Sequence, residues 1–110
     1  MTGLTHRHAA GALVLLVFGA ADARAAELGD PTRGLDYARV HCAECHGVEP
    51  AEMISPFSDV PSFRDIARTP GMSDLALFSF FQTTHPTMPD FIVPSADVQD
   101  LVAYLASLKR

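Results

Sequence analysis

The sequence is short of cysteine, of basic residues and of long apolar runs, and each shortage narrows what the chain can be. It has only two cysteines, both in one short motif, so none remains for a structural disulfide. Its main apolar run, residues 9–21, has 13 residues, whereas a membrane-spanning helix needs about 20. A chain of 110 residues holds one domain.

The N-terminus has the pattern of a secretory signal. A positively charged start precedes the run 9–21, and Ala23-x-Ala25 follows it as a small-residue cleavage site. We expect residues 1–25 to be a signal peptide cut after Ala25, which leaves 26–110 as the domain exported to the periplasm. An uncleaved membrane anchor is the alternative.

The expected mature chain is acidic. Residues 26–110 contain 12 acidic and 6 basic residues, a net charge of −6. This balance argues against nucleic acid and anionic lipid as partners, because both would repel it. It suits a protein partner with a basic docking patch, or a neutral one.

The chemistry of the chain is concentrated in Cys42-Ala43-Glu44-Cys45-His46. Two thiols three residues apart, followed at once by an imidazole, form the pattern that attaches a c-type haem. On one turn of helix Cys42 and Cys45 face the same way, so each can form a thioether to one vinyl group. His46 then serves as the proximal nitrogen ligand of the iron.

Two other interpretations of this motif remain open. A thioredoxin-like redox pair would need a βαβ context, and no such pattern is visible in the sequence. A structural zinc site needs four ligands, so His41 and His85 would have to join the two cysteines.

The second axial ligand of the iron is expected from a proline-rich segment. Met88 precedes Pro89, which biases its backbone toward an extended conformation and gives a stiff loop that presents a thioether. Met53 follows the haem motif too closely to reach the far face, and Met72 lies beside a glycine at a helix start. His85 as the ligand, and an open sixth position, are the alternatives.

Four helical stretches are expected, separated by proline-rich loops. They are a helix from Pro31, capped by Asp30, that runs into the haem motif; a short helix over 62–68; an apolar helix from Ser73 that contacts core and haem edge; and a last helix capped by Ser95, with the apolar stripe Val98, Leu101, Val102, Leu105 and Leu108.

At this point the chain resembles the small class I monohaem cytochromes c. The resemblance rests on four segments in the family's order: Gly34-x-x-Tyr37-Ala38 leading into the haem motif and Gly47; Pro61-Ser62-Phe63; His85-Pro86-Thr87-Met88-Pro89; and Leu101-Val102-Ala103-Tyr104-Leu105. It implies an all-α cytochrome c fold, with three to four short helices around one covalently attached haem c. It also implies that the first and last helices cross near Gly34 and Tyr104, and that the Pro61 carbonyl accepts a hydrogen bond from the His46 ring.

We therefore predict a periplasmic one-electron carrier that is not an enzyme, since His46 and Met88 fill both axial positions. Its partners would be redox proteins of a respiratory chain, a donor dehydrogenase or reductase and an acceptor oxidase. No small-molecule substrate is expected, and membrane contact would come only through partners. The alternatives are a haem subunit of a periplasmic dehydrogenase and a gas-binding or peroxide-reducing haem protein. Lys109 is the only lysine, so docking rules of lysine-rich carriers do not transfer.

Overall fold

The computed structural model describes residue 3, residues 29–84, residue 88 and residues 92–110. The expected signal peptide, apart from residue 3, lies outside these residues, and so do His85 and Pro89. None of the described helices is long and apolar enough to span a bilayer.

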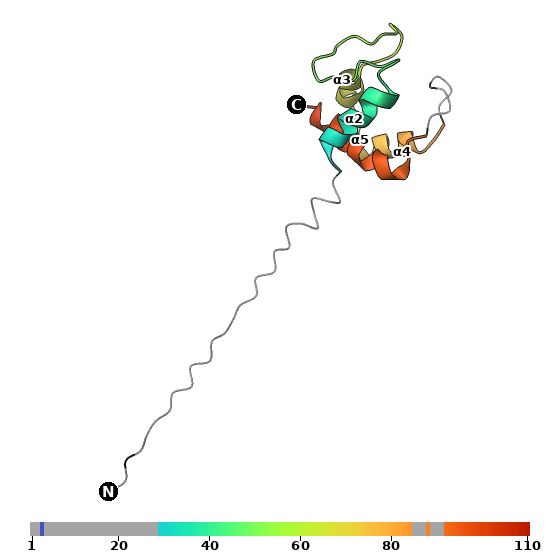
Figure 1. The fold of residues 1–110 in the computed structure, drawn as a ribbon. Coiled ribbons are helices and arrows are strands. Elements are labelled where there is room, and N and C mark those ends of the chain that lie inside the picture. Colours follow the sequence, from blue (N-terminus) through green and yellow to red (C-terminus); the bar gives the residue numbers. More distant parts are fainter. Residues whose placement is uncertain (1–2, 4–28, 85–87, 89–91) are drawn as a thin grey trace.

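The described residues form four helices and no strand, which confirms the predicted all-α fold (Figure 1). The helices are α2 (Pro31–His41), α3 (Phe63–Arg68), α4 (Asp74–Phe81) and α5 (Ser95–Ser107).

The core is organised around α5, which packs against α2, α3 and α4 (Figure 1). Its expected apolar stripe lies at the centre of the molecule, where Val98, Leu101 and Leu105 are at most 1% exposed. Helical spacing places these side chains on one face. The other helices cover that face, so apolar side chains of both partners are buried away from water.

Helices α2 and α5 pack against each other in very close contact at Gly34. A Cβ atom at this position would lie 2.8 Å from the Cβ of Tyr104 and 2.6 Å from the carbonyl carbon of Asp100. Real Cβ atoms essentially never come this close to other heavy atoms. The two helices therefore cross at the place that the family resemblance implied, and only glycine fits there.

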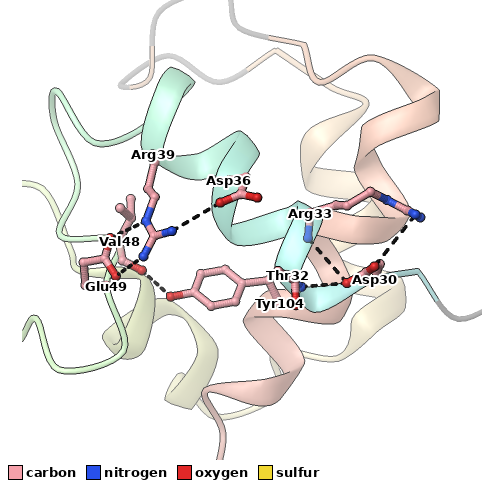
Figure 2. A network of polar contacts seen from close by, with 8 residues as sticks. All are labelled: Asp30, Thr32, Arg33, Asp36, Arg39, Val48, Glu49 and Tyr104. Carbon is pink, nitrogen blue, oxygen red and sulfur yellow. Dashed lines mark hydrogen bonds and ion pairs between the residues drawn. The ribbon is translucent and has the colours of Figure 1, made fainter.

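A polar network closes the N-terminal end of this crossing. Asp30 caps α2 by accepting hydrogen bonds from the backbone N–H groups of Thr32 and Arg33 (Figure 2). The buried carboxylate of Asp100 accepts from the Asp30 backbone N–H at 2.6 Å and from Arg33 Nε at 2.7 Å. The start of α2 is thus bound to α5 across 70 residues of sequence.

One expected helix cap is wrong. Ser95 is the first residue of α5, and Pro94 takes the N-cap position with no side-chain hydrogen bond to the helix. Pro94 accepts through its backbone carbonyl instead, from the N–H groups of Asp97 and Val98 at 2.9 and 3.1 Å. The helix therefore begins one residue earlier than it would if Ser95 were the cap.

Candidate functional site

The haem motif follows directly on the end of α2. The helix ends at His41, and Cys42 forms its C-cap with a φ of −120°. The Cys42 carbonyl accepts from the N–H of Cys45 at 3.2 Å and from that of His46 at 2.9 Å. The motif is therefore a pair of hydrogen-bonded turns. The expected continuation of the helix into the motif is wrong.

The His46 ring is held by a backbone carbonyl. Its Nδ1 lies 2.8 Å from the carbonyl oxygen of Pro61. Because a carbonyl can only accept, Nδ1 must carry the proton in this hydrogen bond, and Nε2 keeps its lone pair. The Phe63 ring contacts the imidazole edge-on, at a centroid distance of 5.5 Å. The imidazole is thus fixed in the tautomer and orientation that a metal ligand needs.

Pro61 owes its position to the start of α3. Ser62, which is 1% exposed, is the N-cap of α3. Its Oγ accepts from the Asp65 backbone N–H at 3.1 Å and donates to the Asp65 carboxylate at 2.9 Å. The next residue, Phe63, donates its N–H to the Gly47 carbonyl at 2.8 Å. These bonds hold the segment that contains Pro61 against the residue that follows His46.

The loop from Gly47 to Pro61 folds back on its own first residue. The backbone N–H of Gly47 donates to the buried Oγ of Ser55 at 3.0 Å. A Cβ at Gly47 would lie 2.8 Å from the carbonyl oxygen of Ile54. The loop can pass this close to the motif only because residue 47 has no side chain.

Two further contacts bind this loop to the helices (Figure 2). The Tyr104 hydroxyl donates to the Val48 carbonyl, and burial raises the pKa of Tyr104 to about 12. Arg39 on α2 forms two hydrogen bonds with the Glu49 carboxylate, at 2.6 and 2.9 Å, and a third with Asp36 at 3.2 Å. The backbone just after the imidazole is therefore attached to both α2 and α5.

The two thiols differ in their surroundings. Cys42 is 7% exposed, and Cys45 is half-buried. Burial, with a smaller contribution from Cys45, raises the pKa of the Cys42 thiol to about 11. Reactive redox cysteines have a lowered pKa instead, so the Cys42 environment does not favour a thioredoxin-like pair.

The zinc interpretation finds no support in the described part of the chain. No three His, Cys, Asp or Glu side chains lie there in an arrangement that could hold a metal ion. His41 instead stacks on Tyr37 at a ring-centroid distance of 4.3 Å. His85, the other expected zinc ligand and the alternative sixth ligand of a haem iron, lies outside the described residues.

The three candidate methionines lie in different surroundings. Met88 is half-buried in a bend, and its neighbours, residues 85–87 and 89–91, lie outside the described residues. Met72 packs against the apolar core. Met53 is 56% exposed on the loop after the haem motif.

Only part of α4 enters the core. Leu77 and Phe81 are buried, as expected for a core helix, whereas Leu75 is 74% exposed, Phe78 39% and Phe80 37%. The sequence also predicted that this helix contacts a haem edge, and that contact stays a prediction.

The sequence reasoning missed several residues that position the site. Ser55 and the pair Ser62 and Asp65 hold the backbone near the imidazole, and Asp100 binds the start of α2. The Ser62-x-x-Asp65 spacing is a recognisable variant of a helix-capping pattern. Ser55 and Asp100 carry no comparable local signal, because their partners lie 8 and 70 residues away.

Comparison with known proteins identifies a c-type cytochrome as a relative of this chain. Cytochrome c-552 of Bradyrhizobium diazoefficiens is 35% identical over 104 residues, which cover 94% of this chain and 98% of the relative. No protein-family model matches the chain, and no solved structure matches it significantly. With this relative aligned over nearly its whole length, the chain belongs to the small monohaem c-type cytochromes, a family of electron carriers that are not enzymes.

Proposed function

We propose that the chain is an exported one-electron carrier with a single haem c. Cys42 and Cys45 would bind the haem through thioethers, and His46 and Met88 would hold the iron. When bound, the haem supplies the Fe(III)/Fe(II) couple. Membership in the cytochrome family makes redox proteins its natural partners; a respiratory donor and acceptor are part of the proposal.

The observation that carries the proposal is the hydrogen bond between His46 Nδ1 and the Pro61 carbonyl at 2.8 Å. It leaves Nε2 as the free ring nitrogen and makes that nitrogen a stronger donor to a metal. The motif's own turns place this imidazole directly after both thiols. The residues of the described site therefore fit covalent haem with one axial histidine.

Met88 suits the second axial position by its chemistry. A thioether is a soft, neutral ligand that favours ferrous iron and raises the reduction potential. Pro89 restricts the backbone of Met88, so little freedom is lost when the sulfur binds. A filled sixth position leaves no site for oxygen or peroxide, as a carrier requires.

Export is proposed from the N-terminal pattern and from the thiols. Haem attachment uses both cysteines, so no free thiol remains to be oxidised outside the cytoplasm. Mass spectrometry of the protein purified from the periplasm tests this point. Residues 26–110 plus one haem are expected, and a mass that includes residues 1–25 would indicate a retained anchor.

Optical spectroscopy of the purified protein tests the axial ligands. The oxidised form should show the weak long-wavelength band of methionine-ligated ferric haem, and the reduced form should not respond to carbon monoxide. Met88→Ala should abolish the band and open the iron to carbon monoxide. Met53→Ala is the matched control and should change neither, because Met53 is 56% exposed on another segment.

Ready binding of carbon monoxide by the unmodified ferrous protein would contradict Met88 as a ligand. The function would then be gas binding or peroxide reduction. A protein purified without covalently bound haem would contradict the roles of Cys42 and Cys45 as well.

A further inference from the structure

Three large apolar side chains on the loop after the haem motif point into solvent. Ile54 is 82% exposed, Met53 56% and Phe57 52%. Beside them lies an open groove of about 390 Å³, whose lining includes Met53, Ile54, Asp59, Pro61 and Asp65. We call these three side chains and the groove the loop surface.

Hydrogen bonds hold the loop that carries this surface. The Gly47 backbone N–H donates to the Ser55 Oγ, as described above, and the Glu49 N–H donates to the Glu52 carboxylate at 2.9 Å. Arg64 on α3 donates to the Pro50 carbonyl at 2.9 Å. An apolar surface ordered in this way loses little conformational entropy on binding, which favours recognition of another molecule.

The charged residues around the loop surface are mostly acidic, and Arg64 is the one lysine or arginine in the segment 44–65. Among the described residues, five carboxylates form an ion pair with lysine or arginine: Asp30, Asp36, Glu49, Asp74 and Asp100. The carboxylates without such a pair are Glu44, Glu52, Asp59, Asp65 and Asp97. All but Asp97 belong to the segment 44–65, which contains the loop, and neither lysine nor arginine lines the groove.

We propose that the loop surface is the docking site for a redox partner protein that presents an apolar patch rimmed by lysine and arginine. An apolar centre with a charged rim is the general anatomy of protein interfaces, and the uncompensated carboxylates select a partner of opposite charge. The groove contains Pro61, whose carbonyl binds His46, so a partner docked there lies next to the ligand of the iron. This inference rests on the proposed electron-carrier function.

Paramagnetic probes test the location on the reduced holo-protein. Tris(phenanthroline)chromium(III) is an apolar trication, and tris(ethylenediamine)chromium(III) has the same charge without the apolar surface. We expect the first to broaden the amide resonances of residues 52–65 at concentrations that leave α5 unaffected, and the second to broaden them less. Equal broadening over the whole surface would overturn the proposal.

Electron transfer to tris(phenanthroline)cobalt(III) tests the contribution of the side chains, since one electron passes from Fe(II) to Co(III). Ile54→Ser and Asp59→Asn should each slow this reaction by about threefold or more at low salt, because they remove apolar contact and electrostatic attraction. The matched controls are Val40→Ser, at a residue 76% exposed on α2, and Asp97→Asn, which changes the net charge equally. Controls that slow the reaction as much would refute the site.

Other occupants of the loop surface give different results. If the haem itself covers Ile54, Ile54→Ser will change the visible spectrum; if a second copy of the chain covers it, the wild type will sediment as a dimer that Ile54→Ser dissociates. Either result overturns docking of a partner. Failure of the docking tests in a protein with an unchanged spectrum and reversible one-electron reduction leaves the carrier function intact, whereas absence of covalent haem refutes both.

Discussion

Replacing Gly34 by alanine sets two effects of opposite sign against each other. Alanine is the better helix former and should stabilise α2 by about 1 kcal/mol. The new Cβ, however, would lie 2.8 Å from the Cβ of Tyr104 and 2.6 Å from the carbonyl carbon of Asp100. Overpacking of this kind costs about 1–3 kcal/mol. We expect the upper part of that range, because a backbone carbonyl cannot turn aside as a flexible side chain can.

The net effect is therefore a loss of about 2 kcal/mol, or roughly thirtyfold in the folded-to-unfolded ratio. Guanidinium unfolding of the holo-protein, followed by far-ultraviolet circular dichroism, measures it as a lower midpoint with an unchanged slope. Gly34→Val should cost more than Gly34→Ala, since it adds two methyl groups at the same crossing. An alanine variant as stable as the wild type would refute the close approach of α2 and α5.

Two further predictions concern polar groups buried between distant segments. Tyr104→Phe removes the hydroxyl that binds the buried Val48 carbonyl and should cost about 1–3 kcal/mol of unfolding free energy, since that carbonyl loses its partner. The hydrogen bond from Arg33, assisted by the Asp30 backbone N–H and opposed by burial, lowers the pKa of Asp100 below its ordinary 3.8. The stabilisation by this carboxylate is therefore complete above about pH 4 and is lost as the pH falls through the folded-state pKa. Asp100→Asn should be less stable than the wild type at neutral pH, and the difference should shrink on acidification.

Each of these variants has a matched control. Tyr37→Phe removes the hydroxyl of a half-buried tyrosine on α2 and should leave the denaturation midpoint close to that of the wild type. Asp97→Asn removes a carboxylate on α5 that has no ion pair with a described lysine or arginine. An acid titration monitored by circular dichroism compares the two variants. The stability difference between Asp97→Asn and the wild type should not shrink on acidification as that of Asp100→Asn does. If the two variants respond alike, the Arg33 contact is not the source of the pH dependence.

Local sequence patterns predicted the helices well and their ends less well. Asp30 followed by Pro31 marks the start of α2, and Ser73 marks that of α4. Each works because a cap involves only the next three or four residues. Ser95 failed as a cap because Pro94 takes the N-cap position and offers its carbonyl to the same first turn. The prediction that the first helix continues into the haem motif was also wrong, because the backbone of Cys42 leaves helical geometry at the C-cap.

The sequence alone determined the chemical motif and the apolar stripe of α5. Both are periodic or contiguous patterns, so their meaning does not depend on the rest of the chain. Tertiary structure decided how the imidazole is oriented, because Pro61 lies 15 residues from His46 and reaches it only once Ser62 begins α3. It also decided that Asp100 is buried against the start of α2 and that the loop after the haem motif exposes Ile54. These outcomes depend on contacts between residues far apart in sequence, which local patterns do not record.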